Sequence, residues 1–429
     1  MRDLLVAGIV LVFALRALGR PHVGLLLFCW ISFMNPHRLC YGFAVQFPWA
    51  LIAALATLIG LLLSQEPKRI PWRSTSILLV VFLSWMFITT LFALNPVAAW
   101  NSWNVVWKIQ LMTFLILLLI NTRERIEQLV WVIVGSLGFY GIKGGIFTVL
   151  TGGGNRVWGP PGSFIEGNNE IGLALIMLIP LLRYLQLRAT AQWLKNGLLG
   201  AMLITLICAL GTQSRGALVG VAAMLLFLVA KSRNKVALLL VLALTVPLMY
   251  SFMPESWHSR MSTIQTYEKD ASAMGRINAW YAAFNIGKDR VVGGGFKVLH
   301  DSLTFRLYAP DPYDQHDAHS IYFEVLAEHG FIGLGLFLGI GLSVWRWASK
   351  TIARAKPHDE YKWMADLCLM LQVSFVAYAT AGAFLGLATF DLYYALIALV
   401  LATNDLLART LVIAPAPQTS SALPALRRA

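Results

Sequence analysis

Two parts of this 429-residue chain contain residue types suited to acid–base and phosphate chemistry. Arg215 lies in the turn 211–216, a hairpin tip between two apolar segments. A positive charge at such a turn is costly near lipid, so its presence indicates an anionic ligand. An Asp- and His-rich stretch ends at His319, directly before another apolar segment. Because a neutral imidazole accepts a proton, the two parts together predict a site that binds an anion and removes a proton.

His319 is expected to be neutral near pH 7. Asp317 has the position of an N-cap for a helix that begins near His319. The exposed N–H groups of a helix N-terminus carry partial positive charge and disfavour an imidazolium. His319 would then hold the form that acts as a general base.

Each candidate also has a plainer interpretation. Arg215 could extend to lipid headgroups, and His319 could simply bond to backbone. Ser214 lacks the first glycine of a nucleophile elbow, because Thr212 stands there, and is interpreted as a small turn residue. Carboxylates bind hard cations, but the spacing in the acidic stretch matches no strong metal motif, so we expect no metal and no other cofactor. That stretch contains Asp311, Asp314, His316, Asp317 and His319.

Further basic residues are candidates for anion binding. Arg156 lies in a Gly- and Pro-rich segment, and Arg276 starts a segment with helical spacing. Arg290 and Lys297 flank the glycine triplet 293–295. Glycine-rich backbone can hold phosphate, but this triplet lacks the phosphate-loop pattern and predicts a turn.

The elements that must position these residues are membrane helices. The chain is 58% hydrophobic and 13% charged, whereas soluble domains are about 25% charged. One span needs about 20 apolar residues, and the composition predicts an all-α polytopic membrane protein with about 12 transmembrane helices. The first two segments are short and are either half-spans or a broken helix. The apolar segments are 4–18, 22–34, 46–64, 76–94, 105–121, 129–150, 168–187, 197–213, 216–231, 236–252, 320–348, 363–383 and 385–403.

The net charge of +13 comes from short Lys/Arg runs between apolar segments. This is the positive-inside pattern, which favours a bacterial inner-membrane protein and argues against nucleic-acid binding. Placing the basic loops in the cytoplasm puts 95–104, 151–167, 214–215, 252–319 and 384–391 on the periplasmic side. The predicted divisions are 1–251 (transmembrane), 252–319 (a large periplasmic loop), 320–405 (transmembrane) and 406–429 (a cytoplasmic tail).

The large loop contains a predicted surface helix. Apolar and aromatic side chains recur at helical spacing within 275–287, which predicts an amphipathic helix lying on the membrane. They are Ile277, Trp280, Tyr281 and Phe284. A second aromatic run is interpreted as an interfacial belt in preference to a sugar-stacking surface. It consists of Trp100, Trp103 and Trp107.

The sequence resembles the O-antigen ligase superfamily over most of its length. Three pieces carry the resemblance: 214–216; Gly275-Arg276 with Trp280 and the glycine stretch 289–295; and His319-Ser320-x-Tyr322 running on to Glu328-x-Gly330. The N-terminal residues 1–4 and 34–37 resemble the exosortase-associated O-glycosylation ligase branch.

The resemblance implies a C-class glycosyltransferase fold with its active site facing the periplasm. The donor would be a glycan on undecaprenyl pyrophosphate and the acceptor lipid A-core, with inversion at the anomeric carbon and without a metal. His319 would be the general base. Arg215, which is also counted as catalytic, would bind the pyrophosphate. The other expected substrate-binding residues are Arg276, Arg156, Arg290, Lys297 and Tyr322.

Three other functions stay open. A glycan polymerase would use the same donor with another lipid-linked glycan as acceptor, and a protein O-oligosaccharyltransferase would use a protein. A transporter is a more distant alternative, since it would need charges near mid-span. Lys108 is the best candidate for such a charge.

Overall fold

The computed structural model describes residues 1–231 and 271–413, with scattered positions between them (235–236, 239–240, 243, 247, 251, 253–255 and 257–258). The expected span 236–252, the start of the predicted 252–319 loop and the tail beyond residue 413 fall largely outside the described residues. All regular elements that the structure describes are helices.

Most described helices match the apolar segments, but α5 starts nine residues before the predicted segment 105–121, and α16 runs ten residues beyond the predicted segment 385–403. Eight of them are long and apolar enough to cross a membrane, within the part of the chain that is described. The protein is therefore a polytopic membrane protein, while the count of about 12 spans remains a prediction. The bundle helices are α1 (Arg2–Gly19), α2 (Pro21–Met34), α3 (Trp49–Leu63), α4 (Ser74–Leu91), α5 (Pro96–Leu119), α6 (Arg123–Leu150), α7 (Asn168–Arg188), α8 (Gln192–Gly211), α9 (Arg215–Lys231), α14 (Ile321–Ala355), α15 (Lys362–Ala381) and α16 (Asp391–Ile413). The remaining helices are α12 (Ala271–Asp289), α13 (Ser302–Tyr308), η1 (Pro36–Leu39), η2 (Phe43–Val45), η4 (Val298–His300), η5 (Asp359–Tyr361) and η6 (Gly382–Phe384).

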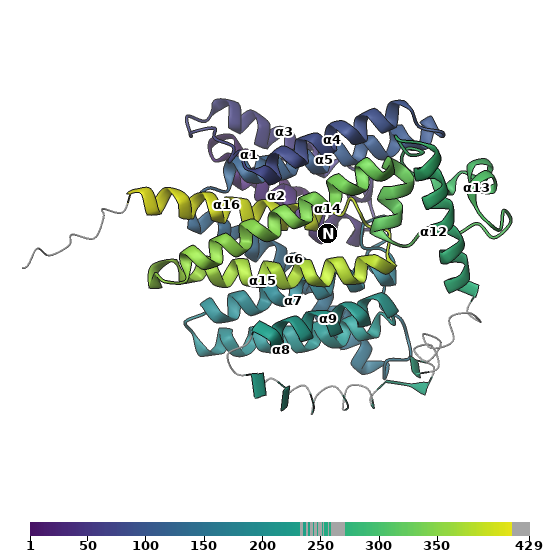
Figure 1. Ribbon diagram of the computed structural model, residues 1–429. Coiled ribbons are helices and arrows are strands. Elements are labelled where there is room, and N and C mark those ends of the chain that lie inside the picture. Colours follow the sequence, from purple (N-terminus) through teal and green to yellow (C-terminus); the bar gives the residue numbers. More distant parts are fainter. Residues whose placement is uncertain are drawn as a thin grey trace, which may run out of the picture.

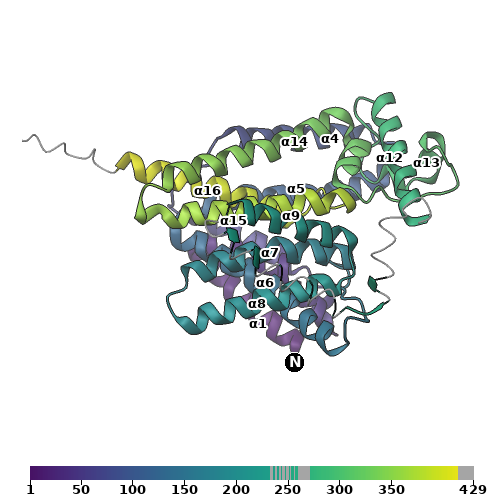
Figure 2. The ribbon, with the colours of Figure 1, turned by 60° about the horizontal axis from the view of Figure 1, so that its bottom comes forward.

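The long helices run side by side (Figure 1). Successive helices alternate in direction from α1 to α9 and again from α14 to α16, whereas α9 and α14 run the same way. The loops 153–167, 212–214 and 382–390 therefore lie at the same end as α12 and α13, which we call the α12 end. The basic loops expected in the cytoplasm lie at the opposite end, where the C-terminal end of α16 is also found (Figure 2). At that opposite end, Arg125 and Glu66 form an ion pair, with 2.7 Å between Arg125 Nη1 and Glu66 Oε2.

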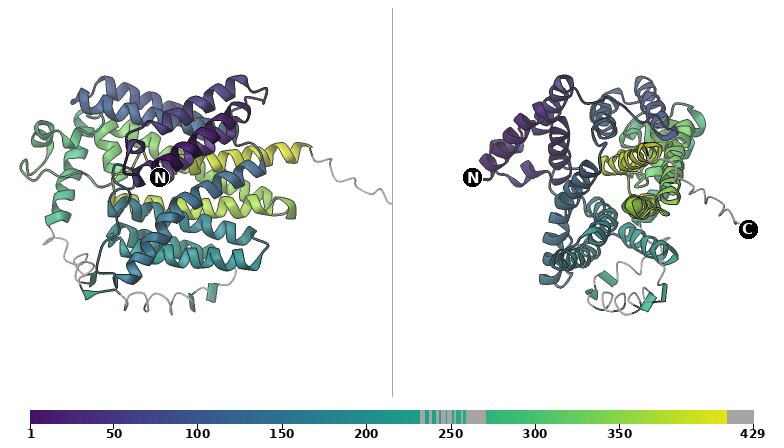
Figure 3. Two further views of the ribbon diagram at one scale, coloured as in Figure 1. Left: turned by 180° about the vertical axis from the view of Figure 1, so that it is seen from behind. Right: turned by 90° about the vertical axis from the view of Figure 1, so that its left-hand side faces the viewer.

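The two short N-terminal segments form a helical hairpin. Arg20 has non-helical backbone angles and separates α1 from α2, and the two helices pack against each other and against α3. Their buried side chains, including Val10, Leu27 and Trp49, form a core of their own. Figure 3 shows these N-terminal helices at one edge of the bundle.

Helix α12 forms where a surface helix was expected and crosses the end of the bundle (Figure 2). Its inner face consists of small residues, and Ala279, Ala282 and Ala283 are fully buried. Small side chains let α12 approach α14 closely. The aromatic side chains Tyr281 (58% exposed) and Phe284 (46% exposed) face outward, where a membrane surface would cover them.

Helix α14 is broken at Gly330, and the break is held by the glycine triplet. Gly330 has φ 68° and ψ −173°, a conformation essentially restricted to glycine. The N–H groups of Gly294 and Gly295 donate to the carbonyls of Ala327 (2.8 Å) and Glu328 (2.9 Å). The chain turns directly before the triplet, where the Gly293 N–H donates to the Arg290 carbonyl at 2.9 Å. The glycine triplet and Gly330, 35 to 37 positions apart in sequence, are one structural unit.

Replacing Gly330 by alanine is expected to destabilise the protein by about 1–3 kcal/mol, because the residue would be strained at this φ. A Cβ there would also lie 2.3 Å from the Val291 carbonyl oxygen. Thermal unfolding of the detergent-solubilised protein measures the effect. Gly335→Ala on the same helix is the control, since a Cβ there meets nothing within 4 Å. Equal melting temperatures for the two variants would contradict the prediction.

Candidate functional site

His319 occupies a strained position in the connection to α14. Its φ is 42°, in the left-handed region that few residues other than glycine adopt, and its side chain is half-buried. The helix begins at Ile321 with Ser320 at the N-cap. The expected cap by Asp317 is therefore wrong, because this carboxylate accepts a hydrogen bond from the adjacent Ala318 N–H at 2.8 Å.

Burial is the main cause that lowers the pKa of the His319 imidazole, and the charges of Arg276 and His316 lower it further. The nearby Asp317 carboxylate acts in the opposite direction. His319 is therefore neutral near pH 7, as the sequence predicted, but the cause is its surroundings and not a helix terminus.

Asp317 remains ionised beside this histidine. Burial alone would raise the pKa of its carboxyl, but the hydrogen bond and charge of His300, with the charge of Lys297, lower it to about 2. His300 Nε2 lies 3.6 Å from Asp317 Oδ2. Such a fixed negative charge stabilises a neighbouring imidazolium when one forms.

The start of α12 brings Arg276 to the same place. A Cβ on Gly275 would lie 2.3 Å from Nδ1 of His316, so only glycine lets α12 pack against this ring. Asn278 fastens the helix to the acidic stretch by donating to the carbonyls of Asp311 (2.8 Å) and Asp314 (3.0 Å). The Gly275-Arg276 motif thus positions a guanidinium within electrostatic reach of His319.

Arg215 begins α9 at the α12 end. Ser214 is buried and caps the helix, its Oγ accepting from the Ala217 N–H at 3.1 Å, which confirms its role as a turn residue. Gln213 links this turn to the 153–167 loop by donating to the Gly153 carbonyl at 3.1 Å. Arg156 in turn donates from Nε to Gln213 Oε1 at 3.3 Å. The turn therefore gathers two of the predicted anion-binding arginines.

The short helix η6 joins the Arg215 turn to the His319 segment. A Cβ on Gly216, next to Arg215, would lie 3.3 Å from Cβ of Phe384. On the other side, a Cβ on Gly382 would meet the Ile321 side chain at 2.7 Å. The starts of α9 and α14 thus pack against the same turn, so the first and third motif pieces meet in space.

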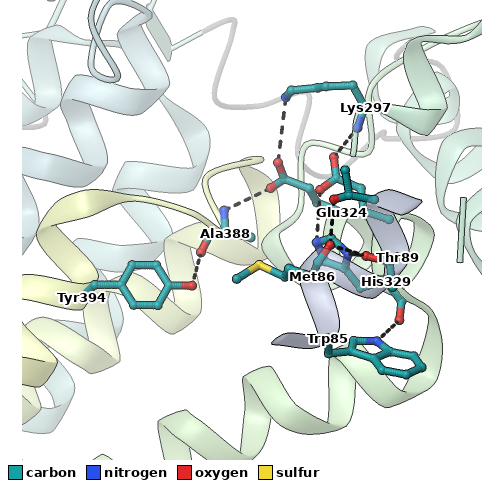
Figure 4. Close-up of polar contacts among 10 residues, drawn as sticks. Trp85, Met86, Thr89, Lys297, Glu324, His329, Ala388 and Tyr394 are labelled. Atoms are coloured by element: carbon teal, nitrogen blue, oxygen red, sulfur yellow. Dashed lines mark hydrogen bonds and ion pairs between the residues drawn. The ribbon is translucent and has the colours of Figure 1, made fainter. Parts of the chain in front are cut away.

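A largely buried acidic residue that the sequence did not single out, Glu324, supports this arrangement; its side chain is 12% exposed. Glu324 Oε2 accepts from the Ala388 N–H at 3.0 Å, and Glu324 Oε1 lies 4.0 Å from Lys297 Nζ (Figure 4). A Cβ on Gly386 would lie 3.4 Å from Glu324 and 3.6 Å from Asp317. The loop 382–390 therefore passes directly over both carboxylates.

The polar network continues into the bundle through the break in α14. Glu328 Oε1 accepts from the Lys297 N–H at 2.7 Å, and Glu328 Oε2 lies 3.8 Å from His329 Nε2. Thr89 on α4 bonds to His329 Nδ1 at 2.7 Å, and Trp85 Nε1 donates to the His329 carbonyl at 2.9 Å (Figure 4). The signal in the sequence was two glutamates at i, i+4 in an apolar segment, which are costly in a membrane unless they are paired.

Three further predicted substrate-binding residues also make contacts within the protein. Arg290 donates to the carbonyls of Gly293 (2.9 Å) and Phe92 (2.8 Å). Tyr322 donates to the Ala379 carbonyl at 2.8 Å. Burial acts to lower the pKa of the Lys297 ammonium, but the surrounding Glu324, Glu328 and Asp317 carboxylates raise it overall.

Lys297 is thus partly neutralised by acids. Its role in substrate binding, like those of Arg290 and Tyr322, stays a prediction. Among the described residues, no group of three or more His, Cys, Asp or Glu side chains is arranged as metal ligands; the expected independence from metal is likewise a prediction.

An apolar groove begins beside the site. It has a volume of about 230 Å³ and lies between α14 and α15. Tyr322 lines its upper part and Trp345 its lower part, six turns further along α14. The groove therefore leads from the neighbourhood of His319 down between the membrane helices.

Two family models match the chain. One, described as O-antigen ligase, matches residues 200–338, a range that contains Arg215, Arg276 and His319. The other, described as a family of unknown function (DUF5935), matches residues 1–190. No curated protein matches the chain. The matched range and the motifs that meet at the α12 end agree: this multi-pass membrane protein contains, at residues 200–338, a domain of the O-antigen ligase family, which implies a glycosyltransferase type of activity.

Proposed function

We propose that the protein transfers a glycan from undecaprenyl pyrophosphate to a sugar hydroxyl of lipid A-core at the periplasmic face of the bacterial inner membrane. The observation that carries this proposal is the convergence of His319 with Arg276 at one end of the bundle. Arg215 lies on the neighbouring turn, and Arg156 lies on the 153–167 loop and bonds to Gln213 of that turn. Helix η6 packs against the starts of both α9 and α14. A base and a set of guanidinium groups are what such a transfer requires.

In the proposed reaction, the acceptor hydroxyl attacks the anomeric carbon and His319 takes its proton. The bond from that carbon to the pyrophosphate oxygen breaks, and undecaprenyl pyrophosphate leaves with the electron pair. The configuration at the anomeric carbon inverts because attack and departure occur on opposite faces. Asp317 stabilises the imidazolium that forms, and no metal is needed where guanidinium groups balance the leaving charge.

Arg215, Arg276 and Arg156 are proposed to bind the pyrophosphate. A guanidinium donates two parallel hydrogen bonds to phosphate oxygens, and each charge-assisted bond contributes about 1.5–3 kcal/mol. These bonds strengthen as charge develops on the leaving oxygen. The undecaprenyl chain is proposed to occupy the apolar groove between α14 and α15, which starts beside Tyr322.

The test is transfer by the purified protein, with undecaprenyl-pyrophosphate glycan and lipid A-core in the presence of a chelator. Glycosylated lipid A-core is the expected product. Elongated lipid-linked glycan would identify a polymerase, and glycosylated protein would identify a protein O-oligosaccharyltransferase. Either result would overturn the proposed acceptor while retaining the donor. Consumption of neither substrate would reject the transferase proposal.

Asp317→Asn is expected to shift the acid limb of the pH–rate profile to lower pH. In the wild type this limb should lie below the ordinary histidine pKa of about 6.5, because burial lowers the pKa of His319. Removing the Asp317 charge removes an influence that raises this pKa, so the base stays neutral to still lower pH. The dependence of kcat/KM on pH measures the shift. Asp359→Asn, at the opposite end, should leave the limb in place; a shift to higher pH in Asp317→Asn would contradict the assignment.

A further inference from the structure

Trp280 on α12 bonds to the backbone directly before His319. Its Nε1–H donates to the Ala318 carbonyl at 2.7 Å. The indole also stacks on the Phe323 ring of α14, with 4.9 Å between the ring centres and 9° between their planes. Both aromatic side chains are half-buried and pack against a core that includes Ala318. The hydrogen bond and the stack together hold the indole in one orientation.

The Ala318 carbonyl belongs to the planar peptide unit that ends at the His319 nitrogen, so the orientation of this unit helps to set φ of His319. Ala318 is fixed on its other side as well, because its N–H donates to Asp317 Oδ1 at 2.8 Å. After His319, the Ser320 carbonyl accepts from the Glu324 N–H at 2.8 Å in the first turn of α14. His319, with φ 42°, is therefore held between two fixed segments.

The left-handed backbone of His319 needs such support. A residue other than glycine keeps this conformation only where the surrounding structure enforces it, and the Trp280 bond ties the strained segment to a different helix. Arg276 lies one turn before Trp280 on α12, and residues four apart share a helix face. One face of α12 thus supplies both a guanidinium within electrostatic reach of His319 and the N–H that fixes the preceding carbonyl.

We propose that Trp280 is a positioning residue for the base: its N–H orients the peptide before His319 so that the imidazole stays beside Arg276 and Asp317, where it receives the acceptor proton. This inference rests on the proposed role of His319 in glycan transfer. Without the bond, the Ala318 carbonyl loses its partner and the peptide can rotate toward an unstrained φ. The imidazole then moves from its half-buried position toward solvent.

The titration of His319 in Trp280→Phe tests the proposal without any substrate. Phenylalanine keeps a ring over Phe323 but has no N–H to donate. Less burial of the imidazole in the variant should raise its pKa toward the ordinary histidine value of about 6.5. NMR of the protein with labelled histidine measures this pKa, and the signal absent from His319→Asn identifies the residue. The wild-type pKa is lowered mainly by burial; of the charged groups nearby, Arg276, His316 and His300 lower it and Asp317 raises it.

Trp85→Phe is the matched control. It removes the same kind of bond, from an indole N–H to the His329 carbonyl at 2.9 Å, ten residues further along the chain than His319. Both substitutions should lower the melting temperature, whereas the pKa of His319 should change only in Trp280→Phe. An unchanged pKa in Trp280→Phe, or an equal change in Trp85→Phe, would overturn the proposal.

A second variant, Phe323→Leu, removes the stacked ring and leaves the indole N–H in place. The indole is then less firmly oriented, so the pKa of His319 should rise by a smaller amount than in Trp280→Phe. If Trp280→Phe does not fold, Phe323→Leu takes its place, and a wild-type pKa of His319 in that protein would overturn the proposal.

Transfer kinetics separate this inference from the proposed function. Trp280→Phe is expected to lower kcat about 10- to 100-fold, because a displacement of about 1 Å can cost about 100-fold, and to leave binding of undecaprenyl pyrophosphate unchanged. In the His319→Asn protein the same substitution should have no further effect, and an additional tenfold loss there would contradict the proposal. Normal transfer by His319→Asn alone would reject the proposed base, whereas an unchanged titration in Trp280→Phe would reject only the positioning by Trp280.

Discussion

His319→Asn is expected to lower the rate of glycan transfer by about 10²–10⁴-fold, the usual contribution of a general base. Asparagine cannot take the acceptor proton, yet it tolerates the left-handed backbone that His319 adopts (φ 42°). Donor binding should stay near the wild-type value, because the proposed pyrophosphate ligands are untouched. Single-turnover transfer and binding of undecaprenyl pyrophosphate, measured on the same preparation, separate the two effects.

His358→Asn is the matched control, since it makes the same change at an exposed position at the opposite end. It should transfer glycan at the wild-type rate. His319→Ala would lose the base as well, but alanine is strained at this φ, so a loss seen only with alanine would indicate misfolding. A well-folded His319→Asn protein that transfers glycan normally would eliminate His319 as the base.

Arg215→Ala is expected to weaken binding of undecaprenyl pyrophosphate by about 10- to 100-fold, which corresponds to one lost charge-assisted contact. Arg215→Lys keeps the charge but loses the planar guanidinium, so its affinity for the lipid should fall between those of the wild type and Arg215→Ala. Transfer should decline at least as much as binding, because the contact strengthens when the leaving group gains charge. Titration of the purified variants with the lipid gives the affinities.

Arg306→Ala controls for a general loss of positive charge at the α12 end. Arg306 is exposed on α13 and lies over the Tyr313 ring, and its removal should not alter donor affinity. A similar loss of affinity for undecaprenyl pyrophosphate in both variants would mean that binding depends on the net charge of the α12 end and not on a specific contact. Unchanged affinity in Arg215→Ala would remove this residue from the pyrophosphate site.

The sequence determined the helical scaffold because each membrane span requires an apolar run within its own segment. Only a helix or a closed barrel can span a membrane, and an apolar run of about 20 residues has the length of a spanning helix. The predicted segments correspond to α4–α9 and α14–α16 with shifts at their ends. The α12 helix followed from its periodicity in the same way. The face of α12 that packs inward could not be predicted in this way. The hydrophobic pattern is dominated by the aromatic residues, whereas the buried face consists of alanines, which allow a close helix contact.

The site itself was determined only in part. Residue type alone marked His319, Arg215 and Arg276, since ionisable groups at the ends of membrane helices are costly without a function. Tertiary structure set the partners of the other two basic residues near the glycine triplet: Lys297 meets Glu324, and Arg290 bonds to backbone carbonyls.

Only the tertiary structure showed why the glycines of two motifs belong together and why His319 is neutral. The triplet 293–295 and Gly330 fit each other through backbone contacts, and the Glu324–Ala388 bond joins segments 64 positions apart. Composition and periodicity describe one segment and its solvent. Contacts between distant segments depend on how the helices pack, and local patterns carry little information about that packing.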